Sequence, residues 1–164
     1  MPSFDVVSRL DRHELVNALD QANREVNNRF DFKNTGAKLE LVEDDIISLV
    51  APSKFQLQQL QQILEVKLVK RGIGLGSLEW EEILESLHEA RQKVKVKHGI
   101  DQETGKKIIK LIKQTPTFKV QASLMGDQIR ITGKKKDELQ KVISFLKSLD
   151  DEIKIPIQFE NFRD

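Results

Sequence analysis

The sequence predicts an α+β protein made of two similar units, each with an antiparallel sheet covered by helices on one face. Three observations support this fold class. Apolar residues alternate with polar ones in several short segments, which is typical of strands. They recur every three or four residues in longer segments, which is typical of amphipathic helices. The order of these segments in the first half of the 164-residue chain is repeated in the second half.

The first half is expected to form a strand, a helix, a hairpin and a second helix. Asp11 stands where it would cap the first helix, with Glu14 at the capping-box spacing. Ser53 would cap the second helix, and Gly72 follows its last turn, where glycine commonly ends helices. The expected elements are a strand at 3–8, a helix from 11 to about 29, a hairpin over 38–50 turning at 43–45, and a helix from 53 to 71.

The second half repeats this order. Segment 49–64 overlays 131–146 at a constant offset of 82 residues. Residues 74–91 fit neither period clearly and are compatible with a short strand or an extra helical turn. The expected elements are a strand at 92–98, a helix over 101–115 capped by Asp101, a hairpin over 119–133 turning at Gly126, a helix through Leu139 and Leu146, and a closing strand through Ile155, Ile157 and Phe159.

This βαββαβ order with one helix layer is the ferredoxin-like plan. The sequence therefore predicts two ferredoxin-like units, at residues 1–90 and 91–164. Units of this size bury little apolar surface alone, so we expect them to pack against one another.

The composition indicates a soluble cytoplasmic protein. There is no cysteine, which excludes disulfides and thiolate chemistry. The first residues lack the basic start and apolar core of a signal peptide. The longest apolar stretches are too short to span a bilayer, so no membrane contact is expected.

Charge is distributed unevenly along the chain. Residues 91–147 carry 15 Lys/Arg against 5 Asp/Glu, whereas residues 1–90 carry 10 against 16. A block this basic favours polyanions by long-range attraction. The alternative is that the acidic and basic halves neutralise each other across an internal contact.

The predicted helix at 101–115 carries its lysines on one face. Lys106, Lys110 and Lys113 fall close together at helical spacing, with Lys107 at their edge. This face would attract phosphate and make binding sensitive to salt. It is equally compatible with an ordinary solvated helix face.

The sheet face away from the helices forms a second polar surface. It would carry Lys93, Lys95 and Lys97 on one strand, and on the later hairpin Lys119, Gln121, Ser123, Arg130 and Thr132. No aromatic residue stands at these positions, which disfavours the base stacking of RNA-recognition domains. Any RNA would be held mainly by its backbone. Packing between the two units is the alternative use of this face.

Several segments resemble the YajQ family of bacterial proteins. They are MPSFDVVS at the start, RFDF (29–32), KLVKRGI (67–73), KVKHGI (95–100), KKIIKLIK (106–113), GDQIRITGKKKDELQ (126–140) and PIQFENFRD at the end. They span the whole chain in the family's order. Residues 74–91 depart most from the family pattern.

The resemblance implies that the two units exchange their first strands, so that strand 3–8 joins the second sheet and strand 92–98 the first. It also implies nucleotide binding, with cyclic di-GMP, GTP or ATP, and RNA such as tRNA as candidate ligands, and with no cofactor. It adds Arg29, Lys67, Arg71 and Arg163 as candidate phosphate ligands. A neighbouring phenylalanine could stack a purine, but Phe30, Phe32, Phe159 and Phe162 are better explained as core residues.

The sequence offers no catalytic or metal centre. His13, His88 and His98 are scattered, and no nucleophile stands beside an orienting base. We therefore expect a non-catalytic protein that binds the phosphate of a nucleotide or RNA through lysines and arginines of residues 91–136, Lys134 included. Two other hypotheses are a protein-interaction module whose basic half docks an acidic partner, and an enzyme acting on nucleotides.

Overall fold

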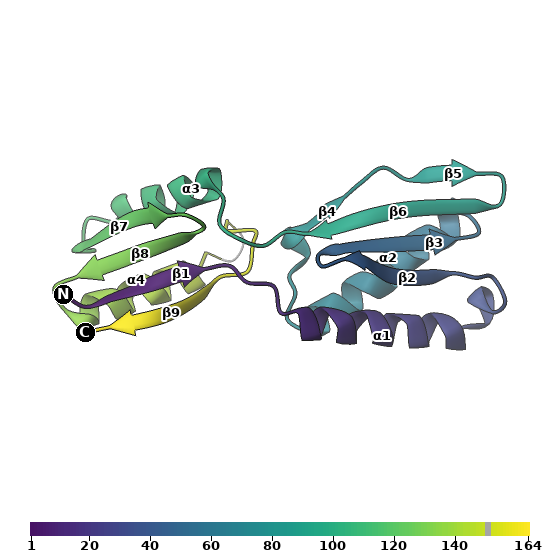
Figure 1. Cartoon of the computed structure of the whole chain (residues 1–164), viewed down its shortest axis with the longest axis horizontal. Coiled ribbons are helices and arrows are strands. Elements are labelled where there is room, and N and C mark those ends of the chain that lie inside the picture. Colours follow the sequence, from purple (N-terminus) through teal and green to yellow (C-terminus); the bar gives the residue numbers. More distant parts are fainter. Residues whose placement is uncertain (150–151) are drawn as a thin grey trace. The chain divides into compact units, whose positions relative to one another are not determined.

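The computed structural model describes residues 1–149 and 152–164, which fold into two compact units. The middle unit is Leu10–Lys97. The terminal unit joins the two ends of the chain, Met1–Arg9 and His98–Asp164. Each unit contains an antiparallel sheet and two α-helices (Figure 1).

The middle unit has the sheet order β2-β3-β6-β4, with β5 paired to β6 beyond this path. Its helices begin where the sequence predicts: the Asp11 side chain accepts from the Glu14 backbone N–H, and the Ser53 side chain accepts from that of Gln56. The elements are α1 (Arg12–Asn28), β2 (Lys38–Glu43), β3 (Ile46–Ala51), α2 (Lys54–Lys70), β4 (Leu78–Trp80), β5 (Leu84–Ser86) and β6 (Glu89–Val96), with short 3-10 turns η1 (Phe30–Phe32) and η2 (Leu75–Ser77).

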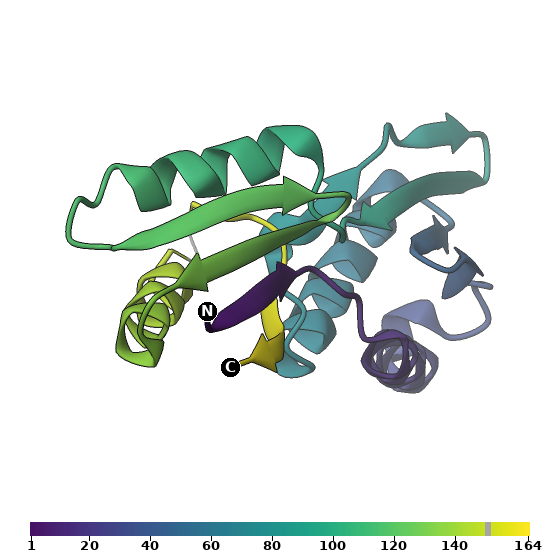
Figure 2. The ribbon, with the colours of Figure 1, turned by 60° about the vertical axis from the view of Figure 1, so that its left-hand side comes forward.

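The terminal unit has the sheet order β7-β8-β1-β9. Figure 2 shows β1, in purple, between β8 and the yellow β9. The Asp101 side chain caps the first helix of this unit by accepting from the Thr104 N–H. The elements are β1 (Ser3–Val7), α3 (Gln102–Lys113), β7 (Val120–Met125), β8 (Gln128–Gly133), α4 (Lys136–Lys147) and β9 (Gln158–Arg163).

The partners of β1 in one sheet and of β6 in the other confirm the predicted fold class of two ferredoxin-like units with exchanged first strands. Strand β1 pairs with β8 and β9, which lie at the far end of the sequence. Strand β6 pairs with β3 and β4. The terminal sheet therefore takes β1 from the other end of the chain, whereas β6 and its partner strands all belong to the continuous stretch Leu10–Lys97. The division of the sequence into halves at residue 90 stays a prediction.

Each unit has its own hydrophobic core, and strand alternation decides what faces it. In the terminal unit Phe4 and Val6 of β1 and Ile129 and Ile131 of β8 are buried against α3 and α4. Their neighbours in sequence, Asp5 and Arg130 among them, therefore lie on the sheet face away from the helices. We call this the open face of the terminal sheet.

Two expectations about element bounds are wrong. The closing strand begins at Gln158, so Ile155 and Ile157 precede it. Gln158 stands opposite Val7, the last residue of β1, so no partner strand extends further in that direction. The strand expected at 92–98 begins instead at Glu89, because β5 pairs with its first residues.

No helix within the described residues is both long and apolar enough to cross a membrane.

Candidate functional site

The structure divides the predicted site residues between the two units. The middle unit holds Arg29, Lys67, Arg71, Lys95 and Lys97, and the terminal unit holds Lys106, Lys107, Lys110, Lys113, Arg130, Lys134 and Arg163. The basic stretch 91–147 is likewise divided, because its first lysines lie in β6. The terminal unit gathers the larger set.

The cations of the middle unit that the family resemblance suggested are paired with carboxylates. Arg29 Nη2 lies 3.1 Å from Asp31 Oδ2. Lys67 Nζ lies 3.3 Å from Glu25 Oε1, and Arg71 Nη1 lies 3.6 Å from Glu14 Oε2. These carboxylates reduce the attraction of the three cations for phosphate. The same unit also holds Lys95, which lies on β6, and Lys97, which follows its last residue.

Helix α3 presents the predicted lysine face. Lys106, Lys110 and Lys113 are exposed and line a groove of about 430 Å³ with Ile109 and Gln114. In the described part of the chain, none of the three lysines has a carboxylate within ion-pair distance. Lys107 differs, because its Nζ donates to the backbone oxygen of Glu152 at 2.9 Å. We call this groove the α3 groove.

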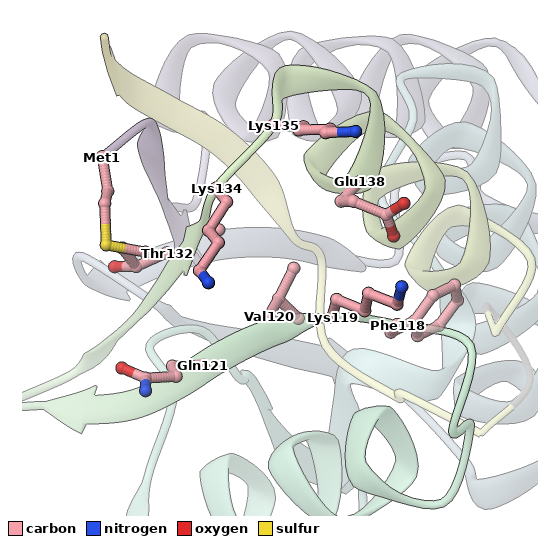
Figure 3. Close-up of a pocket in the computed structure, with 10 residues that line it drawn as sticks. Met1, Phe118, Lys119, Val120, Gln121, Thr132, Lys134, Lys135 and Glu138 are labelled. Carbon is pink, nitrogen blue, oxygen red and sulfur yellow. The ribbon is translucent and has the colours of Figure 1, made fainter.

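A hollow of about 480 Å³ lies beside the start of β7 and the connection from β8 to α4 (Figure 3). We call it the β8–α4 hollow. Figure 3 shows Lys134 pointing from that connection toward the β7 side. Gly133 lets the connection pass closely, since a Cβ there would stand 3.2 Å from both Leu139 and Val120. The lining residues are Met1, Phe118, Lys119, Val120, Gln121, Thr132, Gly133, Lys134, Lys135 and Glu138.

A second hollow, of about 500 Å³, lies between α3 and β7. It shares Phe118, Val120, Gln121 and Thr132 with the β8–α4 hollow, and Lys113 with the α3 groove. The three depressions therefore form one continuous basic surface on the terminal unit. Lys119 and Lys135 belong to the basic stretch 91–136 that the sequence predicts to bind phosphate, but the sequence did not single them out as individual site residues. The run of three lysines after Gly133 was the signal for Lys135.

Glu138 is the acid on the wall of the β8–α4 hollow. Its Oε1 lies 3.4 Å from Lys141 Nζ. Its Oε2 is buried and has no hydrogen-bond partner among residues 1–149 and 152–164. A carboxylate here lowers the positive potential of the hollow, although Lys141 offsets part of its charge.

Asp5 and Arg130 form the most buried ion pair on the open face of the terminal sheet. Asp5 is 4% exposed, and Arg130 Nε donates to its Oδ1 at 3.0 Å. Asn161 Nδ2 donates to the other oxygen at 2.8 Å. Burial alone would raise the pKa of the Asp5 carboxyl, but these hydrogen bonds and the charges of Arg130 and Arg163 outweigh it and hold the pKa below its ordinary value.

Only some of the phenylalanines that the sequence assigns to the core are buried. Phe32 is 3% exposed, and Phe159 packs against the core of the terminal unit. Phe162 is 58% exposed, although its ring stacks on Phe4 with centroids 5.7 Å apart. Phe30 is 93% exposed, so its assignment to the core is wrong.

No group of three His, Asp or Glu residues that could hold a metal ion occurs in the described ranges.

Comparison with known proteins gives a consistent result over the whole chain. The family profile described as "Nucleotide-binding protein YajQ-like" matches residues 2–163. A nucleotide-binding protein of Nitrosococcus oceani is 51% identical over 164 residues, covering both chains completely. A protein of Xanthomonas campestris pv. campestris (strain 8004) named "Cyclic di-GMP-binding protein" is 49% identical, also over the full length of both chains.

Proposed function

Because the chain belongs to the family of YajQ-like nucleotide-binding proteins, we propose that it binds a nucleotide by its phosphate on the basic surface of the terminal unit. The candidate ligands are a purine nucleotide such as GTP or ATP, a cyclic dinucleotide such as cyclic di-GMP, and RNA such as tRNA. All of them present phosphate oxygens. The ammonium group of lysine binds such oxygens through its positive charge and its three N–H donors. A relative of similar length is named for cyclic di-GMP, which supports the second class.

The observation that carries this proposal is the gathering of lysines around two joined hollows. Lys119, Lys134 and Lys135 line the β8–α4 hollow, and Lys113 lines the hollow between α3 and β7. Their volumes lie within the range of small-ligand sites, about 300–1,000 Å³. Gln121 and Thr132 add neutral donors, and Phe118 and Val120 add an apolar wall. Phosphate would be held by the lysines while the sugar or base lies against that wall.

We further propose that binding is not followed by a reaction. No histidine lines either hollow. Glu138 is the carboxylate among the lining residues, and its contact is with Lys141 rather than with the hydroxyl of Thr115, Ser123 or Thr132. Nucleophilic catalysis requires a base within hydrogen-bond reach of the hydroxyl. Incubation with GTP, ATP and cyclic di-GMP should return each ligand unchanged, and formation of product would overturn this part of the proposal.

The test of binding is a triple substitution, Lys119→Gln, Lys134→Gln and Lys135→Gln. Loss of three ammonium groups should weaken binding of GTP or cyclic di-GMP by tenfold or more, and should flatten its dependence on salt. The matched control replaces Lys33, Lys54 and Lys70, which are exposed lysines of the middle unit, with glutamine. Equal affinities of the two triple variants would refute the proposed site.

Titration with GTP, ATP, cyclic di-GMP and tRNA also distinguishes nucleotide binding from the protein-interaction hypothesis. A module that docks an acidic protein would show no saturable binding to any nucleotide or to tRNA. A thermal shift with each ligand gives an independent readout, because a ligand that binds only the folded state raises its stability by mass action.

A further inference from the structure

The Asp5–Arg130 pair lies on a part of the terminal unit that the lysine site does not include. Registers across the sheet place Ser123, Arg130, Asp5 and Glu160 in one row, and Gln121, Thr132, Ser3 and Arg163 in the next. These side chains share the open face, because the alternate positions of β1 and β8 fill the core. The face therefore has many polar groups and one deeply buried carboxylate.

The arginine is held by one edge and free at the other. Only its Nε donates to Asp5. The terminal nitrogens Nη1 and Nη2 have no hydrogen-bond partner in the described part of the chain, and the side chain is 34% exposed. A guanidinium in this arrangement presents parallel N–H groups, which match two oxygens of a phosphate.

Asn161 also donates a hydrogen bond to Asp5, and its backbone conformation is unusual. Its φ is 59°, in the left-handed region, and the pairing of β1 with β9 shifts register next to it. Bulges of this kind redirect a side chain, and asparagine tolerates the left-handed region better than most residues. Here the bulge directs the Asn161 amide to the oxygen of Asp5 that Arg130 leaves open.

We propose that Arg130 is a second phosphate-binding residue of the terminal unit and that Asp5 and Asn161 are its positioning residues. Thr132, which lines both hollows, stands two residues from Arg130 on the same face of β8, roughly 7 Å along the strand. Ser123 lies directly opposite Arg130 and lines one of the hollows. A ligand whose first phosphate occupies the lysine site can therefore extend a second phosphate to Arg130. This inference rests on the proposed function, since the lysine site holds the first phosphate.

The ligand class that follows is a nucleotide with two phosphates separated by a nucleoside. The test compares GMP with the linear dinucleotide pGpG by titration calorimetry on the full chain. Wild type should bind pGpG about 10- to 100-fold more tightly than GMP. Arg130→Gln should remove that advantage, because it should weaken pGpG binding far more than GMP binding. Arg130→Lys should recover only part of it, because lysine keeps the charge but not the paired donors.

The positioning residues are tested by Asp5→Asn and Asn161→Gly. Both should reduce the pGpG advantage without changing GMP affinity, and glycine preserves the left-handed backbone at 161. Arg91→Gln is the matched control, since Arg91 is also bonded to a carboxylate, Glu89, but on the other sheet. If Asp5→Asn weakens GMP and pGpG equally, its role is structural and the positioning claim is wrong.

The wild-type protein provides a readout that needs no variant. Addition of pGpG should shift the side-chain 15N–1H resonance of Arg130 Nε, whereas GMP should not. One outcome would overturn this inference and keep the proposed function. In it, Lys119→Gln weakens pGpG binding, but pGpG does not shift the Arg130 resonance and Arg130→Gln does not change pGpG affinity. Absence of binding by both probes would overturn this inference, and absence of binding by GTP, ATP, cyclic di-GMP and tRNA as well would overturn the proposed function.

Discussion

Gly105 of α3 and Leu124 of β7 are in direct contact in the terminal unit. A Cβ at position 105 would stand 2.8 Å from Leu124 Cδ1 and 3.5 Å from Ile100. The missing side chain lets the helix lie close to the sheet, opposite the lysines of the α3 groove. A glycine inside a helix costs about 1 kcal/mol relative to alanine, so this contact offsets an unfavourable local propensity.

We predict that Gly105→Val destabilises the protein by about 1–3 kcal/mol, since an added isopropyl group must displace Leu124 or move the helix. Gly105→Ala should change the free energy of unfolding by less than about 1 kcal/mol, because its gain in helix propensity offsets a small shift of one flexible side chain. Urea denaturation of both variants gives the comparison. A valine variant as stable as the alanine variant would contradict the close packing.

Lys107 and Lys110 should behave differently although both lie on α3. Lys107 Nζ is bonded to the Glu152 carbonyl, whereas Lys110 lines the α3 groove. Lys107→Gln should lower stability by about 0.5–1.5 kcal/mol and leave nucleotide affinity nearly unchanged. Lys110→Gln should do the opposite. Thermal unfolding and a nucleotide titration on the same samples check both, and a reversed pattern would contradict the geometry.

Phe30 and Phe32 form a matched pair for stability. Phe32 is buried in the middle unit, so Phe32→Ala should cost about 3–5 kcal/mol. Phe30 is almost fully exposed, so Phe30→Ala should change stability by less than about 0.5 kcal/mol. Chemical denaturation measures both. A large loss for the Phe30 variant would show that its ring is covered in solution.

Asp5 should make folding sensitive to acid. Its pKa in the folded protein is below the ordinary value, so its contribution is complete above about pH 4 and is lost as the pH falls through the folded pKa. Other carboxylates titrate in the same range, so the measurement is the difference between wild type and Asp5→Asn. The wild type should lose more stability between about pH 5 and pH 2 than the variant. Parallel curves would show that Asp5 has the same pKa folded and unfolded.

The helix caps and the hairpin turn of this fold could be predicted from the sequence, because each depends on residues that are close together in the chain. Asp11, Ser53 and Asp101 each cap the helix that the sequence assigns to them, through a backbone N–H three residues later. The hairpin turn at Gly126 has the positive φ that favours glycine. Caps and turns need only neighbouring residues, so they can be read from the sequence.

The remaining features depend on partners far away in the sequence. Strand β5 exists because β6 offers it an edge, which residues 84–86 do not reveal by themselves. Arg130 and Asp5 are 125 positions apart, so their pairing follows from the exchanged strand. The lysine face of α3 could be predicted from helical spacing, but the bond that occupies Lys107 could not, since its acceptor is a backbone oxygen in a later loop.

The pairing of Ser3 with Arg163 brings the two chain termini to neighbouring strands. A short Gly/Ser linker from Asp164 to Met1 would therefore allow a circular permutant that begins at Leu10 and ends at Arg9. Both units would then be continuous in sequence, and the central strand of the terminal sheet would follow β9 directly. Fewer distant contacts would have to form, so this permutant should refold faster than the natural chain order.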